Sequence, residues 1–163
     1  MNIKKNQHGM LVRYNNYKYY SFIDEVKRII NEKGYCWFFK VGKVIPCNKV
    51  QGIVKSGGFI VLKAPKSEDD KYFFAHATDY YTGLPRKDMP YPSYYTAMMN
   101  DDSMWMIESL EGTWIKIDYV GELTHENINH LFLLSNNKPL DAVVHSTRSA
   151  TMYLYSDSDL FLQ

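Results

Sequence analysis

Cysteine is scarce in this sequence. Its 163 residues include two cysteines, Cys36 and Cys47, which lie on separate expected segments. We therefore expect two reduced thiols rather than a disulfide, as is usual in the cytoplasm. Metal sites need more Cys or His at close spacing, and His125 and His130 stand five residues apart rather than the four that share a helical face. The sequence accordingly predicts neither a bound metal nor a cofactor.

Long apolar runs and an excess of one charge are also missing. The start, MNIKKNQHGM, lacks the apolar stretch of a signal peptide, and no window approaches the ~20 apolar residues of a membrane span. The 19 Lys and Arg residues are balanced by 18 Asp and Glu residues. This balance excludes a strong overall attraction to DNA or to an anionic membrane, but not a local basic patch. We expect a soluble cytoplasmic protein without a membrane partner.

The sequence has no phosphate-binding loop of the form G-x-x-x-x-G-K-[S/T], and Gly57-Gly58 is too short to form one. It also has no internal repeat, low-complexity tract or linker. The length suits one domain with its own core. We expect a single domain over 1–163, made of an N-terminal segment and helix over 1–34, a core over 35–155 and a tail over 156–163.

Aromatic residues are abundant, at 15% of the chain with 14 Tyr and 3 Trp. Such residues favour strands and can also stack on bases. The clearest helix is YYSFIDEVKRIINEKG, where Ser21 is placed to cap the N-terminus and Gly34 to end the helix. Its apolar residues Phe22, Val26, Ile29 and Ile30 share one face.

The remaining segments predict an α+β fold. The runs FIVLKAP and YFFAHATDYY are separated by a short polar turn and should form a hairpin. A proline-rich loop covers 83–93. The order of elements indicates a mostly antiparallel sheet, either strongly curved or closed into a small barrel, with flanking helices. Strands are expected over 35–41, 59–65, 72–81, 113–123 and 150–156. A short helix is expected to begin at Asn48. The segments 124–137 and 138–147 are expected to be helical or mixed.

Two His-x-Thr triplets are candidates for catalysis. They are His76 to Thr78 and His145 to Thr147, with the histidines 69 residues apart. The pair resembles the signature of the 2H phosphoesterase family, which cleaves cyclic phosphates and RNA ends. In that family the histidines exchange protons and the hydroxyls hold the phosphate, a task that suits imidazole near neutral pH. The pattern is short, and His76 in a strand is also typical of a structural histidine.

The succession YCWFFKVGK, GGFIVLKAPK, KYFFAHATDYYTGLP, YPSYY and GTWIKIDYVGEL resembles the PUA-like superfamily over roughly residues 35 to 155. This superfamily includes the EVE, ASCH and YTH domains, which are small barrels that bind RNA or modified bases. By position, the first strand of the family is Tyr35 to Val41, the glycine-led strand is Gly58 to Lys63, and the tryptophan-led strand begins at Trp114. The resemblance implies a base-binding pocket.

We therefore predict a non-enzymatic module that binds RNA or modified DNA. An aromatic pocket between the sheet and the 83–96 loop would hold one base, and basic side chains would contact the flanking phosphates. Each ring or lysine also has a plain structural interpretation, as a core residue or as a solvated strand end. The candidate contacts are Trp37, Lys40, Lys63, Lys66, Tyr80, Tyr81, Tyr94, Tyr95, Trp105, Trp114 and Arg148.

Two alternatives remain open. One is the phosphoesterase that uses His76, Thr78, His145 and Thr147. The other is a protein of a phage or mobile element that binds and inhibits a host protein, because the chain is small and its Asn-, Lys-, Ile- and Tyr-rich composition is typical of an AT-rich genome.

Overall fold

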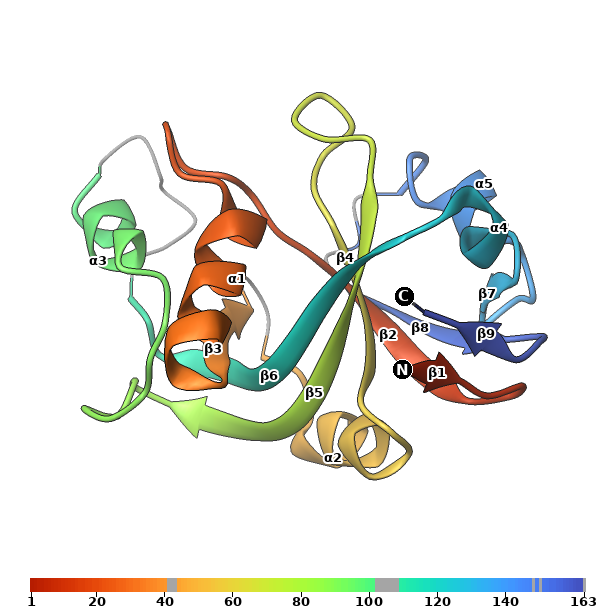
Figure 1. Cartoon of the computed structure of the whole chain (residues 1–163), viewed down its shortest axis with the longest axis horizontal. Coiled ribbons are helices and arrows are strands. Elements are labelled where there is room, and N and C mark those ends of the chain that lie inside the picture. Colours follow the sequence, from red (N-terminus) through yellow and green to blue (C-terminus); the bar gives the residue numbers. More distant parts are fainter. Residues whose placement is uncertain (41–43, 102–108, 148, 150, 163) are drawn as a thin grey trace.

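The computed structural model describes residues 1–40, 44–101, 109–147, 149 and 151–162. A seven-stranded sheet with the order β3-β6-β5-β4-β2-β8-β7 runs through the molecule (Figure 1). Its neighbouring strands are antiparallel except β2 and β4, which are parallel. The strands are β2 (His8–Arg13), β3 (Cys36–Lys40), β4 (Phe59–Lys63), β5 (Tyr72–Gly83), β6 (Gly112–Leu123), β7 (Leu131–Leu133) and β8 (Thr151–Ser156).

A separate two-stranded ribbon joins the two ends of the chain. In it β1 (Asn2–Ile3) pairs with β9 (Leu160–Phe161), so the labelled termini lie side by side in Figure 1. The helices of the described chain are α1 (Phe22–Lys33), α2 (Cys47–Lys55), α3 (Tyr94–Met99), α4 (His125–Ile128) and α5 (Leu140–Val143). None of them has the length and apolar composition that crossing a bilayer requires.

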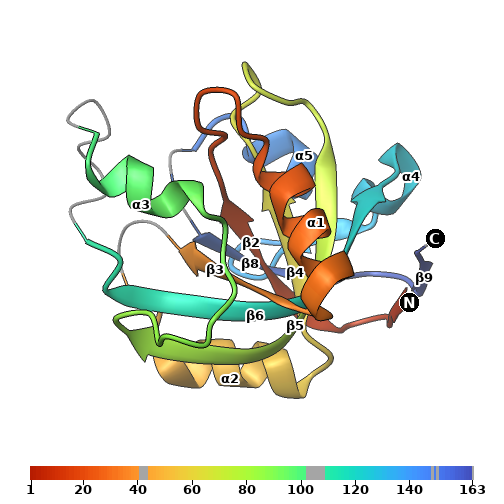
Figure 2. The ribbon, with the colours of Figure 1, turned by 60° about the vertical axis from the view of Figure 1, so that its left-hand side comes forward.

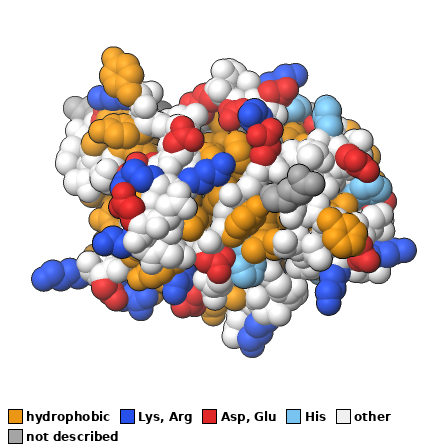
Figure 3. Space-filling view, viewed as in Figure 1, with side chains coloured by type: hydrophobic (Ala, Val, Ile, Leu, Met, Phe, Trp, Pro, Cys, Tyr) orange, Lys and Arg blue, Asp and Glu red, His pale blue; other side chains and the backbone are white. Residues whose placement is uncertain are grey.

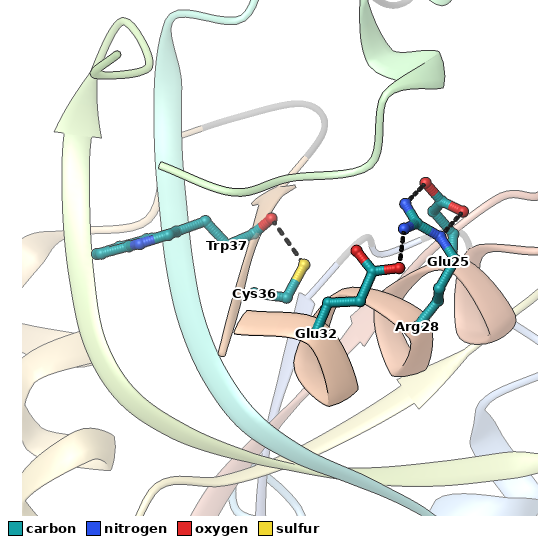
Figure 4. A network of polar contacts seen from close by, with 5 residues as sticks. All are labelled: Glu25, Arg28, Glu32, Cys36 and Trp37. Carbon is teal, nitrogen blue, oxygen red and sulfur yellow. Dashed lines mark hydrogen bonds and ion pairs between the residues drawn. The ribbon is translucent and has the colours of Figure 1, made fainter. Parts of the chain in front are cut away.

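Helix α1 forms as its sequence predicts. The Ser21 side chain accepts a hydrogen bond from the Asp24 amide, and Gly34 ends the helix in the left-handed conformation at φ 85°. Arg28 lies between two carboxylates of the same helix, 2.8 Å from Glu25 and 2.7 Å from Glu32 (Figure 4). Such pairs on an exposed helix surface each stabilise it by only about 0.3–0.5 kcal/mol.

The long strands β5 and β6 connect two hydrophobic cores. Alternate strand residues belong to different cores, since Phe73 and Ala75 join the first whereas Tyr72 and Phe74 join the second. Helices α1, α2 and α3 contribute to the first core, and β1, β7, β9, α4 and α5 contribute to the second. Figures 1 and 2 show α1 and α2 on opposite sides of the paired β5 and β6.

The α+β class and the mostly antiparallel sheet are confirmed, but the closed barrel is wrong. Strands β3 and β7 are the two edges of the sheet, and no pairing among the described residues joins them. The loop that follows β5 and helix α3 cover part of the β3 edge. The Trp37 amide donates to the Pro90 carbonyl of the loop at 2.8 Å, and the Phe39 amide donates to the Tyr95 hydroxyl of α3 at 3.4 Å. Capping an edge in this way protects it without closing the sheet.

The chain ends differ most from the sequence-based expectation. We expected the first residues to lie outside the core, yet β2 is an interior strand between β4 and β8. Its residues Gly9 to Val12 are all buried and so show no alternation from which a strand could be identified. The expected tail contributes β9, and α2 begins at Cys47 after Pro46 rather than at a capping Asn48.

Candidate nucleic-acid interface

Trp114, the main predicted stacking platform, is a core residue. Its side chain is fully buried, and its indole N–H donates to the Leu110 carbonyl at 3.0 Å. The rings of Phe39, Tyr91 and Tyr95 surround it with centroids 5.1, 5.2 and 6.0 Å away. Trp114 therefore presents no ring face to a base in this structure.

Trp37 is also covered, although by a surface residue. It is 4% exposed, and the guanidinium of Arg86 lies 5.8 Å from its ring centroid and 4.6 Å from that of Tyr81. Figure 4 shows the indole pointing away from α1. Because only 4% of its surface is exposed, Trp37 presents no ring face on which a base could stack.

Four more of the predicted contacts, Lys40, Lys63, Tyr94 and Tyr95, are buried. Lys63 is fully buried and donates through Nζ to the carbonyls of Ala64 and Asp69 at 2.8 and 2.5 Å. Burial lowers the pKa of Lys63 and that of Lys40, which is 4% exposed. Tyr94 and Tyr95 are buried, Tyr80 and Tyr81 are half-buried, Lys66 is exposed, and Trp105 and Arg148 lie outside the described residues.

The first His-x-Thr triplet lies at an irregularity in the sheet. The pairing of β5 with β6 shifts register on both sides of Ala77, next to His76. The imidazole Nδ1 of His76 lies 2.7 Å from a carboxylate oxygen of Asp118, a residue that the shifted register leaves without a partner in the ladder. β-bulges reorient side chains in this way, and this one pairs a partly exposed His with an Asp.

The second triplet is held at another level of the sheet. His145 and Thr147 follow α5, where the Thr147 carbonyl accepts a hydrogen bond from Arg13 at 3.0 Å. Arg13 pairs with Lys63 of β4, whereas His76 pairs with Phe59, four residues (about 13 Å) along the same strand. No described hydrogen bond joins the two triplets, so the structure gives no sign that they form one site.

A different surface gathers basic side chains around a hollow. A groove of about 580 Å³ lies between α2, the turn that joins β1 to β2, and β8. In Figure 1, α2 and this turn lie along the lower edge of the molecule. We call it the α2–β8 groove. The residues that matter for its chemistry are Lys4, Lys5, His8, Lys49, Gly52 and Tyr153.

Each wall of the groove follows from local structure. The side of α2 that faces it carries Lys49, Gly52 and Ser56 at helical spacing. The β1–β2 turn is fixed by Gln7, whose side-chain oxygen accepts a hydrogen bond from the Lys4 amide at 2.9 Å. Tyr153 of β8 is half-buried, so part of its ring forms a wall.

The groove is electropositive. Three lysines line it and are exposed, and the described lining residues include no Asp or Glu. The Lys49 ammonium lies 5.4 Å from the centroid of the Tyr153 ring, and burial raises the pKa of the Tyr153 hydroxyl. Two carboxylates outside the lining interact with Lys5: Asp159 accepts a hydrogen bond from its amide at 2.7 Å, and Asp157 interacts electrostatically with its side chain. On the face of the molecule drawn in Figure 3, by contrast, Lys and Arg side chains (blue) are mixed with Asp and Glu side chains (red).

Sequence reasoning missed this groove because its parts are distant in the chain. The adjacent pair Lys4-Lys5 in MNIKKNQHGM was the one visible signal, and it lay in a segment that we did not expect to join the core. Lys49 and Tyr153 are ordinary in their own segments and become neighbours only because β2 pairs with β4 on one side and with β8 on the other.

Among the described residues, no group of three or more His, Cys, Asp or Glu is arranged to hold a metal ion. No protein-family model matches the chain, and no curated protein and no solved structure is significantly similar to it. The resemblance to the PUA-like superfamily therefore stays a prediction.

Proposed function

We propose that this protein binds single-stranded nucleic acid in the α2–β8 groove and does not act on it chemically. The observation that carries this proposal is the combination of three exposed lysines and a half-buried tyrosine in one hollow, with no carboxylate among its described lining residues. Lysines contact phosphates without regard to sequence, and an aromatic ring stacks on any base. This is the chemistry that we expected from the sequence, at a different place on the molecule.

Gly52 provides independent support. A glycine inside a helix costs roughly 0.5–1 kcal/mol relative to alanine. A Cβ atom built on Gly52 would have no neighbour within 4 Å, so packing does not require the glycine. Because Gly52 lines the groove, a side chain there would narrow the hollow. Keeping the groove open is a reason for glycine at this position.

The test is the salt dependence of binding to a labelled single-stranded oligonucleotide, followed by fluorescence anisotropy. If Lys4, Lys5 and Lys49 each neutralise one phosphate, the plot of log affinity against log salt should have a slope that is more negative by about 2 units than without them. The variant with all three lysines changed to Gln should lose that part of the slope and bind more weakly at low salt.

A matched variant changes three exposed lysines outside the groove, Lys33, Lys71 and Lys87, to Gln. This variant has the same net charge as the groove variant. Comparing the two therefore separates the loss of lysines in the groove from a general loss of positive charge. Equal losses in the two variants would contradict a site in the groove. Failure of the unchanged protein to bind any RNA or DNA strand at low salt would contradict the proposed function itself.

A further inference from the structure

We infer that the bound strand inserts one base into a second pocket beside the groove, where Thr151 contacts its edge. This inference rests on the proposed function and adds where a base is held and what kind of group the pocket accepts. The second pocket has a volume of about 420 Å³ and shares Leu134 and Tyr153 with the α2–β8 groove. The two hollows are therefore neighbours. We call the second one the β7–β8 pocket.

The pocket exists because β7 is short. Strand β7 pairs with β8 only from Leu131 to Leu133, and the Leu134 amide makes a last bond to the Tyr153 carbonyl at 2.9 Å. The chain then turns away, while β8 continues back to Thr151. The part of β8 beyond this pairing and the turn after β7 both line the pocket.

The described residues that line the β7–β8 pocket are all neutral. They divide into aliphatic groups, such as Val143 and Met152, and hydroxyl groups, such as Ser135 and Thr147. A nucleobase is a flat, uncharged group with a polar edge, which suits apolar walls with a few hydroxyls. A phosphate would be poorly accommodated there, whereas the lysines of the adjacent groove suit it.

Thr151 supplies a hydroxyl in need of a partner. Its Oγ1 is buried and makes no hydrogen bond with any described residue. A buried hydroxyl without a partner is costly, and a ligand that offers a donor or acceptor removes that cost. Thr151 lines the pocket, and the inference is that rotation about χ1 turns this hydroxyl towards the base edge when a strand binds.

The rim of the pocket is held in place before any ligand binds. Arg13 donates from its guanidinium to the carbonyls of Val144, Thr147 at 3.0 Å and Ser149 at 2.8 Å. Three bonds from one rigid fork tie the backbone carbonyls of Val144, Thr147 and Ser149 to strand β2. A preformed pocket binds without the entropy cost of ordering a loop.

An abasic scan tests the inference. A set of oligonucleotides of one sequence, each lacking the base at one position, is titrated against the unchanged protein. We expect one position at which loss of the base weakens binding by about tenfold, and losses of less than about twofold at positions outside the site. Thr151→Val, which keeps the shape and removes the hydroxyl, should reduce the affinity of the intact strand but not that of the strand lacking the critical base.

A blocking variant provides the second arm. Ser135 lines the pocket from an exposed turn, so Ser135→Leu should fill the entrance without disturbing the core, and Ser135→Ala, which removes the hydroxyl without filling the entrance, is its control. Ser135→Leu should abolish the position dependence and retain the salt slope. Uniform small losses across the scan, or equal behaviour of the two variants, would overturn the base pocket and leave the groove standing. Absence of binding to every oligonucleotide would overturn both.

Discussion

Replacing Gly52 by alanine should make the protein more stable, because the glycine lies inside α2 and its Cβ position faces open space. Alanine gains helix propensity and restricts the unfolded chain, and together these effects are worth about 0.5–1 kcal/mol. For a domain of this size, 1 kcal/mol corresponds to roughly 2–4 °C in Tm. We therefore expect Gly52→Ala to raise Tm by about 1–4 °C.

A longer side chain at the same position should separate stability from binding. Gly52→Gln places a good helix former on α2, so its stability should also be equal to or above that of the unchanged protein. Its side chain would project into the α2–β8 groove beside Lys49, where we expect it to weaken oligonucleotide binding by about tenfold, equivalent to 1.4 kcal/mol. A substitution that fills a binding site often raises the stability of a protein while it lowers the protein's function.

Urea unfolding monitored by circular dichroism gives the stability, and anisotropy with a labelled strand gives the affinity. Gln51→Ala, at an exposed position of α2 outside the groove lining, is the control for changes in helix propensity. Two results would refute the reasoning. If Gly52→Ala destabilises the protein, the space beside Gly52 is filled, and if Gly52→Gln binds as tightly as the unchanged protein, the groove is not the binding surface.

Two further predictions concern the buried aromatic and titratable groups. Trp114→Ala should destabilise the protein by about 3–5 kcal/mol in urea unfolding, because it empties a fully buried indole site, and any loss of nucleic-acid binding should follow the unfolded fraction. Stability should also fall as pH rises above about 9, because burial raises the pKa of the Cys36 thiol from 9.0 to about 12. The folded state holds this proton while the unfolded state releases it, so the contribution is complete below pH 9 and is lost towards pH 12. Cys36→Ser should reduce this slope, and an unchanged slope in urea midpoints between pH 8 and 11 would contradict it.

The features that sequence alone determined are local ones. The apolar spacing and the Ser21 and Gly34 caps of α1 act within a few residues, so the helix and its ends were predictable. The hairpin of β4 and β5 was also predictable, since two apolar runs flank a short polar turn. These patterns were sufficient for the α+β class and for a mostly antiparallel sheet.

Tertiary structure decided which side chains are accessible. Trp114, Tyr94 and Tyr95 have the residue types of a stacking surface, but neighbouring elements cover them, and no local pattern records that cover. Strand β2 was missed because both of its faces are buried and its parallel partner β4 lies some 50 residues away along the chain. That same strand brings β8 into the sheet, and with it Tyr153 beside Lys49. The groove therefore depends on long-range strand pairing, which short-range sequence periodicity does not specify.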